Sequence, residues 1–276
     1  MRIDAHQYFW LFDPLTDTWI TEEMKVIQRN FLPNDISKTL KDHRLDGAVL
    51  VQAHQSLRET DFLIELADAY KMVKAVIGWI DLGAEDIEEQ LLKFSGVPVV
   101  KGFQHNVEAE MDVDFLMQDS IQRGIRALTQ HHYTYDLLIH PRHYTSTLQC
   151  VASNPDQAFM LDHMAKPAIE AGDFDAWASF IESLSVFPNV YCKISGLVTQ
   201  VDGENWTFND CVPYVKHVIS CFGKHRVCFG SDWPKSLVAA TYEEVLSIAE
   251  RCVEGFGEVE QADFWGRNAV RFYGIT

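Results

Sequence analysis

Asp232 is the residue of this chain whose position most clearly suggests chemistry. It lies where the apolar run 226–229 breaks into a turn at residues 230–234. A carboxylate at the end of a buried strand can take a proton from water as that water attacks an ester or amide carbonyl. Ser231 or Asp232 could instead cap the segment that follows. Trp233, next to Asp232 in this turn, is predicted to contact the same ligand.

Two histidines occupy comparable positions upstream. His6 follows an apolar run near the N-terminus and shares one strand face with Tyr8, since alternate residues of a strand point the same way. His163 ends a second run, and Lys166 follows it closely. These side chains are typical of a site that polarises a carbonyl, with Tyr8 and Lys166 as ligand contacts. A hydrogen-bonded structural role for His6 and a surface ion pair for Lys166 are the alternatives.

Three further side chains are candidates for ligand binding. Lys193 lies within the apolar run 190–194, where a charge is unfavourable unless it is paired. His54 and His105 are each expected just beyond a predicted strand, at the rim of a site. Most of the remaining histidines are expected not to be catalytic.

The elements that must position these residues alternate along the chain. Apolar runs rich in β-branched residues predict eight strands, at residues 2–5, 48–52, 75–80, 97–102, 135–139, 158–161, 190–194 and 226–229. Helix-like stretches accompany them, at residues 35–44, 59–70, 85–94, 114–123, 143–151, 174–184, 210–222 and 242–252. Gly124 and Gly223 follow two of these stretches and are interpreted as helix stop signals.

This alternation predicts an α/β fold, a (β/α)8 TIM barrel that forms a single domain over residues 1–276. Near-continuous apolar strands indicate a parallel sheet covered on both faces, and eight βα units close most simply into a barrel. An open, doubly wound sheet is the alternative. Two aromatic-rich stretches, 11–33 and 198–209, are expected to be loops that wall a pocket or close the core.

Composition excludes several classes of partner. The chain has 23 Lys and Arg against 40 Asp and Glu, a net charge of −17, so its surface repels nucleic acid and anionic membranes. Its apolar runs are of strand length, which predicts no membrane span. The six cysteines form no Cys-x-x-Cys pair and are expected to be reduced, which predicts a cytoplasmic protein. Both a monomer and a homo-oligomer stay open.

Taken together, six motifs resemble the amidohydrolase superfamily, in its branch of L-fucono-, L-rhamnono- and pyrone-dicarboxylate-lactonase-like proteins. They lie at residues 3–10, 49–53, 100–105, 161–167, 193–197 and 229–234, with further matches at 268–269 and 272–273. The resemblance spans nearly the whole chain and implies a distorted form of the (β/α)8 barrel. It also implies that Asp232 activates water, and that His6, His163 and Asp232 are the possible metal ligands.

Two positions depart from the family pattern. Tyr8 stands where a second metal-binding histidine is usual, and a phenol is a poorer ligand than an imidazole. The resemblance therefore implies either no cofactor or one divalent cation, zinc or manganese, at a weakened site. Gln104 stands where an arginine usually precedes His105, which removes a cation that could pair with a substrate carboxylate. This departure favours a neutral sugar lactone over a dicarboxylate, with Gln104 as a substrate contact.

The predicted function is hydrolysis of a small sugar-acid lactone. His6 and His163 would polarise the ring carbonyl, and Asp232 would deprotonate the attacking water. Gln104 and the two lysines would hold hydroxyls or oxyanion charge. A metal-dependent amidohydrolase or decarboxylase acting on another small carbonyl substrate is one alternative, and a small-molecule binder without catalytic activity is a second.

Overall fold

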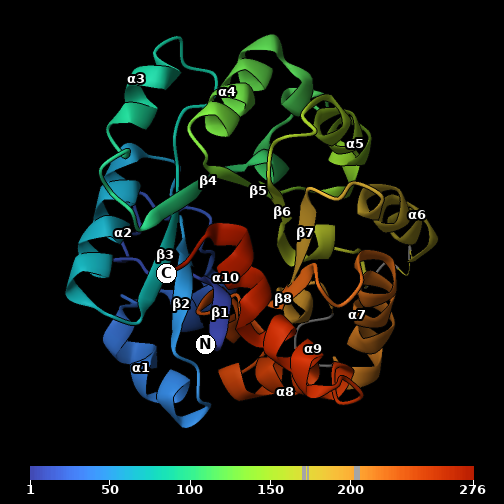
Figure 1. Cartoon of the computed structure of the whole chain (residues 1–276). Coiled ribbons are helices and arrows are strands. Elements are labelled where there is room, and N and C mark those ends of the chain that lie inside the picture. The colour runs from blue at the N-terminus through green and yellow to red at the C-terminus, as the bar shows by residue number, and fades with distance from the viewer. Residues whose placement is uncertain (170–171, 173, 202–205) are drawn as a thin grey trace.

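Eight parallel strands form one sheet, in which the strands follow one another in chain order (Figure 1). The computed structural model describes residues 1–169, 172, 174–201 and 206–276. The strands are β1 (Ile3–Gln7), β2 (Gly47–Val51), β3 (Val73–Gly78), β4 (Val100–Asn106), β5 (Thr134–Leu138), β6 (Phe159–Leu161), β7 (Val190–Ile194) and β8 (Val227–Phe229). The predicted (β/α)8 barrel is confirmed.

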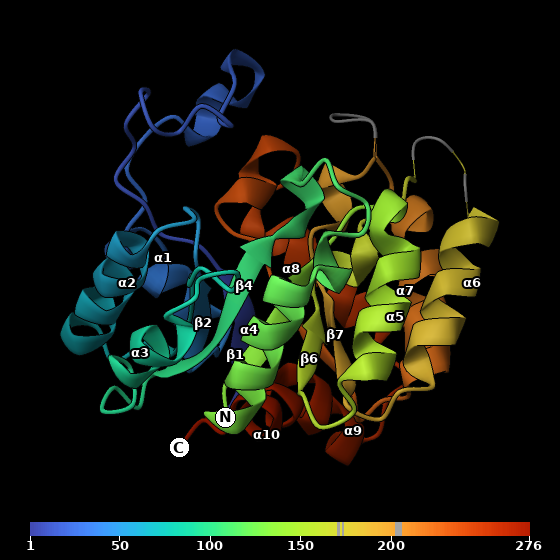
Figure 2. The ribbon, with the colours of Figure 1, turned by 90° about the horizontal axis from the view of Figure 1, so that it is seen from above.

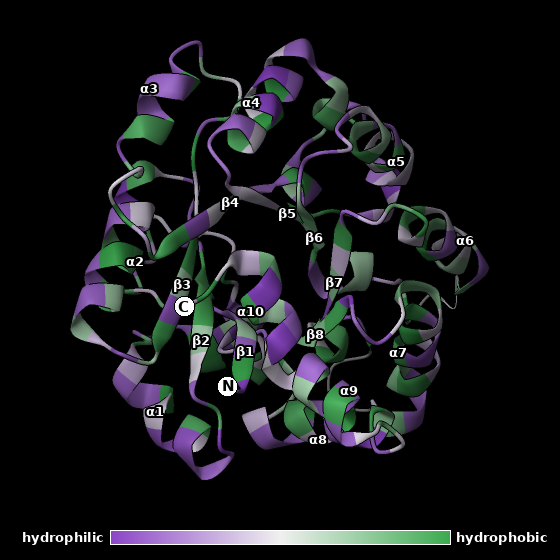
Figure 3. Ribbon diagram, in the orientation of Figure 1, coloured by the Kyte–Doolittle hydropathy of each residue, from purple (hydrophilic) through white to green (hydrophobic). Residues whose placement is uncertain are grey.

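Helices surround the sheet, and one follows each strand (Figure 1). They are α1 (Pro33–Asp42), α2 (Leu57–Ala69), α3 (Ile87–Leu92), α4 (Asp119–Gln130), α5 (Tyr144–Ser153), α6 (Phe174–Ser185), α7 (Phe208–Phe222) and α8 (Tyr242–Cys252), with α9 (Glu258–Ala262) and α10 (Asn268–Tyr273) after them. Most helices carry both hydrophilic and hydrophobic residues, as expected where one side packs on the sheet (Figure 3). Within the described residues, no helix combines the length and apolar character needed to span a membrane.

The limits of β4 and α4 differ from those predicted. β4 extends to Asn106, so His105 lies within the strand and not beyond it. Since strand residues alternate, Gln104 and His105 point to opposite sides, and Gln104 is the one that is buried. Gly124 lies inside α4 and does not end it, so the predicted stop signal there is wrong. The backbone of Leu82 passes close to this position, where a Cβ would lie 2.1 Å from the Leu82 carbonyl oxygen. Gly223 does end α7, with a φ of 71°.

The barrel closes where β1 meets the end of β8. The Tyr8 amide donates to the Trp233 carbonyl at 2.8 Å, and the Asp232 amide donates to the His6 carbonyl at 3.0 Å. These bonds place two predicted catalytic residues side by side. The chain termini lie at the opposite end of the barrel from the dark-blue loop that follows β1 (Figure 2).

Asp4, the second residue of β1, reinforces this closure from inside the protein. The side chain is fully buried, and its Oδ1 accepts a hydrogen bond from the Ser231 amide at 2.8 Å. Its Oδ2 accepts from Gln7 Nε2 at 2.7 Å and from the Tyr242 hydroxyl at 3.1 Å. One carboxylate therefore joins β1, the turn after β8 and α8.

Replacing Asp4 by alanine should lower the free energy of unfolding by about 4 kcal/mol or more, because it leaves four buried donors, the His6 amide among them, without an acceptor at about 1–3 kcal/mol each. Urea denaturation of the variant and the unmodified protein measures the change. Asp46→Ala is the control, since Asp46 also accepts from a backbone amide, that of Arg2, but is exposed. Equal losses for the two variants would contradict the role of Asp4.

Candidate active site

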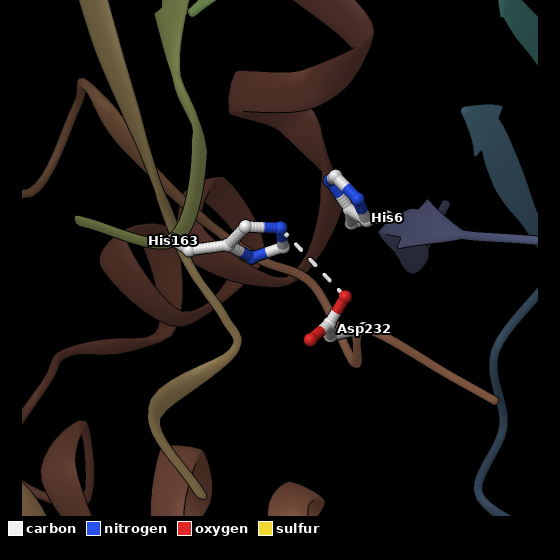
Figure 4. A group of neighbouring side chains, drawn as sticks. All are labelled: His6, His163 and Asp232. Carbon is white, nitrogen blue, oxygen red and sulfur yellow. Dashed lines mark ion pairs between the residues drawn. The ribbon is translucent and has the colours of Figure 1, made fainter. Parts of the chain in front are cut away.

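His6, His163 and Asp232 meet at the carboxyl ends of three strands (Figure 4). They come from β1, from the short 3-10 helix Asp162–Ala165 after β6, and from the turn after β8. All three are buried, and their ligand atoms lie within 4.8 Å of one another. His163 Nε2 lies 3.7 Å from Asp232 Oδ1, and His163 Nδ1 lies 2.9 Å from Ser195 Oγ. The structure thus brings the three predicted catalytic residues together, while their catalytic roles stay predictions.

Each member of this triad carries a buried polar atom that has no hydrogen-bond partner in the described part of the chain. These atoms are His6 Nε2, His163 Nε2 and Asp232 Oδ1. Burial raises the pKa of Asp232 to about 6, against the opposing effect of Lys235 and Lys166. Burial lowers the pKa of His6 to about 4 and that of His163 well below its usual value. At neutral pH the triad is one carboxylate beside two neutral imidazoles.

Lys193, on β7, is fully buried beside the triad. Its Nζ lies 2.6 Å from Asp136 Oδ2, 2.9 Å from Asp162 Oδ1 and 3.2 Å from His6 Nδ1. Burial alone would lower the pKa of Lys193, but the two carboxylates raise it above its ordinary value. Lys193 thus hydrogen-bonds to Asp136 and His6 and forms an ion pair with Asp162, so its charge is compensated within the protein. The predicted contact between Lys193 and a substrate stays a prediction.

The contact with Lys193 determines which nitrogen of His6 carries the proton. Because an ammonium group can only donate, Nδ1 must offer its lone pair, and the proton therefore lies on Nε2. Asp162 Oδ1 also lies 3.4 Å from Nδ1, but a proton on Nδ1 would face the ammonium group. His6 consequently enters the site as a hydrogen-bond donor.

An unusual stretch of backbone positions His163. Residues 163–166 all have φ between 48° and 60°, a left-handed conformation that is unfavourable by roughly 1–2 kcal/mol for each non-glycine residue. The Trp177 indole donates to the Met164 carbonyl at 2.7 Å and helps to hold this turn. Gly196 packs on the other side, where a Cβ would lie 2.7 Å from His163 Nδ1. Neighbouring elements therefore fix the position of the imidazole.

A cavity of about 140 Å³ adjoins the triad at Tyr8, whose ring centroid lies 4.8 Å from that of His6. Its lining consists of Tyr8, Trp19, Gln52, Ala53, Gln55, Gln104, Asn106, Glu108, Leu138 and Lys235. Two predicted substrate contacts, Tyr8 and Gln104, are among these residues. Burial raises the pKa of Tyr8 well above its ordinary value, so the phenol stays neutral. The predicted loop 11–33 reaches the cavity through Trp19, whereas residues 202–205 of the second predicted loop lie outside the described residues.

Two other predicted substrate contacts have acidic partners. Lys166 is largely buried and forms an ion pair with Glu108, which lines the cavity. His54 Nε2 lies 2.7 Å from the buried Asp17 Oδ1, which ties the end of β2 to the loop after β1. Lys166 thus contacts a residue of the cavity lining. His54 does not line this cavity and lies instead in a second hollow with Asp13 and Gln55.

The two remaining predicted contacts pack against other side chains. His105 Nε2 lies 2.8 Å from Glu110 Oε1, and its ring stacks on Phe115 at 4.7 Å. Trp233 is buried, and its ring packs edge-on against Phe31 at 5.3 Å. The structure therefore does not bring these two residues into the lining of the cavity.

Asp136, Asp162 and Gln52 are residues of the site for which no role was predicted from the sequence. Asp136 is fully buried in β5, and it is the one acid in an apolar run, just as Lys193 is the one base in its run. Two opposite charges, each in an otherwise apolar strand, are a signal for a buried ion pair. No comparable signal distinguishes Gln52, because a glutamine that ends a strand is more often exposed.

Comparison with known proteins places this chain among characterised hydrolases. It matches the family described as Amidohydrolase over residues 3–275. It is 34% identical to an L-fucono-1,5-lactonase of Burkholderia multivorans, over 100% of this chain and 96% of that protein. An L-rhamnono-gamma-lactonase of Scheffersomyces stipitis is 22% identical, over 74% of this chain and 70% of that protein.

A solved structure agrees with these matches. The crystal structure of an amidohydrolase from Burkholderia multivorans with bound zinc is 33% identical, covers 100% of both chains and superposes with a TM-score of 0.95. The two proteins therefore share the same fold over the whole chain. This chain therefore belongs to the amidohydrolase family.

Proposed function

We propose that this protein is a hydrolase that opens a sugar-acid lactone to the free hydroxy acid. The observation that carries the proposal is the convergence of His6, His163 and Asp232 within 4.8 Å, beside a cavity. Relatives named as an L-fucono-1,5-lactonase and an L-rhamnono-gamma-lactonase support a sugar lactone as the substrate. L-fucono-1,5-lactone is therefore the test lactone for the experiments below.

In the proposed reaction, the Asp232 carboxylate takes a proton from water as the water oxygen bonds to the lactone carbonyl carbon. The Nε2–H group of His6 donates to the carbonyl oxygen and stabilises the charge that develops there. His163 Nε2 lies 3.7 Å from Asp232 Oδ1, so this imidazole is a second polar group next to the carbonyl carbon. When the bond between the carbonyl carbon and the ring oxygen breaks, Asp232 returns the proton to that oxygen.

A divalent cation fits this donor set only in part. His163 Nε2 and Asp232 Oδ1 are suitable ligands with no hydrogen-bond partner among the described residues. His6 is unsuitable, because Lys193 occupies Nδ1 and the proton therefore blocks Nε2. A catalytic zinc site normally has three protein ligands. We infer that hydrolysis by this chain does not depend on a metal.

Asp232→Asn should lower kcat on the test lactone by roughly 10²–10⁴-fold, because an amide cannot accept the proton of the attacking water. Initial rates followed with a pH indicator measure the change. Asp263→Asn is the matched control, since Asp263 is also buried but pairs with His225 and Arg271 away from the triad. Full activity of Asp232→Asn would rule out the proposed mechanism.

The rate should depend on pH in the direction set by Asp232. Burial raises the pKa of this carboxyl from 3.8 to about 6, and only the ionised form can act as a base. We therefore expect kcat/KM to fall about tenfold per pH unit below pH 6 and to level off above it. Rates corrected for spontaneous opening at each pH test this. A plateau that extends down to pH 4 would mean that a different group is the base.

Removal of metal should leave the activity intact. Dialysis against EDTA, followed by elemental analysis to confirm that zinc and manganese are absent, should leave kcat on the test lactone within about twofold of its initial value. Adding either cation back should not raise it. Loss on chelation with recovery on adding zinc or manganese would favour the metal-dependent alternative.

A further inference from the structure

Gln52, directly after β2, is a cavity-lining side chain with one unused polar atom. It is 4% exposed, and its Nε2 donates to Gln104 Oε1 at 3.1 Å. Its Oε1 is buried and has no hydrogen-bond partner in the described part of the chain. A buried acceptor without a partner is unfavourable by about 1–3 kcal/mol. A ligand that brings a donor into the cavity would remove this penalty.

The orientation of the Gln52 amide is not free, because a chain of hydrogen bonds determines it. Gln104 Nε2 donates to Asp162 Oδ2 at 2.5 Å, and Lys193 holds the other oxygen of Asp162 at 2.9 Å. A carboxylate paired with an ammonium group can only accept, so Gln104 must direct its NH2 group toward Asp162. Its carbonyl oxygen then faces Gln52, which must direct its own NH2 group toward Gln104.

Reversing either amide would create a repulsive contact. If Gln52 alone turned over, two carbonyl oxygens would lie about 3 Å apart, and if both amides turned over, Gln104 would present an oxygen to Asp162. The buried pair of Lys193 and Asp162 therefore fixes the orientation of the Gln52 amide, which is linked to it through Gln104. At the cavity wall, Gln52 presents an acceptor and not a donor.

We infer that Gln52 is a specificity-determining residue whose Oε1 accepts a hydrogen bond from one ring hydroxyl of the lactone. The inference rests on the proposed function and adds to it the requirement for a donor at one substrate position. Among neutral sugar lactones, an analogue that lacks that hydroxyl leaves the acceptor unsatisfied. Sites that hydrogen-bond a substrate hydroxyl reject the analogue without it for this reason.

The test measures kcat/KM for the test lactone and for its monodeoxy analogues, one for each ring hydroxyl, with the unmodified protein and with Gln52→Met. In the unmodified protein, one deoxy analogue should be slower by roughly tenfold or more. Gln52→Met should slow the test lactone by a similar factor. That deoxy analogue should then suffer no further loss, because the two changes remove the same hydrogen bond.

Gln90→Met is the matched control. Gln90, on α3, also donates through Nε2 to a side chain, that of Asp86 at 2.7 Å, and its Oε1 is likewise buried without a partner in the described residues. It is not part of the cavity lining. The control should keep the discrimination of the unmodified protein, and thermal unfolding should show comparable stability for the two variants.

A second measurement needs no variant and shows whether Gln52 accepts a hydrogen bond from the substrate or donates one to it. Fluorine in place of the same hydroxyl can accept weakly but cannot donate, so the fluoro analogue should react with the unmodified protein as slowly as the deoxy analogue. A fluoro analogue as fast as the test lactone, or losses that multiply in Gln52→Met at every position, would overturn the inference. If Asp232 proves essential but all the analogues have the same kcat/KM, only the role of Gln52 is contradicted. If no lactone is opened, both the proposed function and the role of Gln52 are contradicted.

Discussion

The buried ammonium group of Lys193 is the constraint on which the site depends. From β7 it reaches Asp136 on β5, Asp162 after β6 and His6 on β1, while the Tyr273 hydroxyl of α10 also donates to Asp136. Residues of β1, β5 and β7, the residue that follows β6 and the last helix thus converge on one charge. Loss of one partner from such a group leaves an uncompensated charge in the interior, which is strongly destabilising. The same pairing fixes the tautomer of His6 and, through Asp162, the orientation of two glutamines.

The barrel could be predicted from the sequence because its strands are buried on both faces. Such strands form near-continuous apolar runs, and eight of them separated by helices leave few other topologies. The convergence of Asp232, His6 and His163 could be predicted from the rule that reactive groups lie at the carboxyl ends of barrel strands. The partner of a charge could not be predicted in this way. Lys193 and Asp136 are separated by 57 residues, and their contact depends on register and barrel closure.

Local backbone geometry was the other feature that the sequence did not reveal. Nothing in the residue types at 163–166 favours a left-handed turn, because none of them is a glycine. The turn persists because Trp177 and Gly196 pack against it, and both belong to later segments of the chain. The end of β4 was missed for a related reason. The polar residues Gln104 and His105 are unlike the interior of a buried strand, yet Gln104 faces polar partners inside the barrel.

Asp4 and the Ser231 amide, which close the barrel, are 227 positions apart in the chain. During synthesis, β1 leaves the ribosome first, and its free edge gains a partner only when β8 follows almost a whole chain later. An unpaired strand edge is a template for pairing with other chains. A nascent chain of this protein therefore carries an open edge through most of its elongation. The proposed catalytic centre, with His6 from the first strand and Asp232 from the turn after the last strand, forms only at the end of that process.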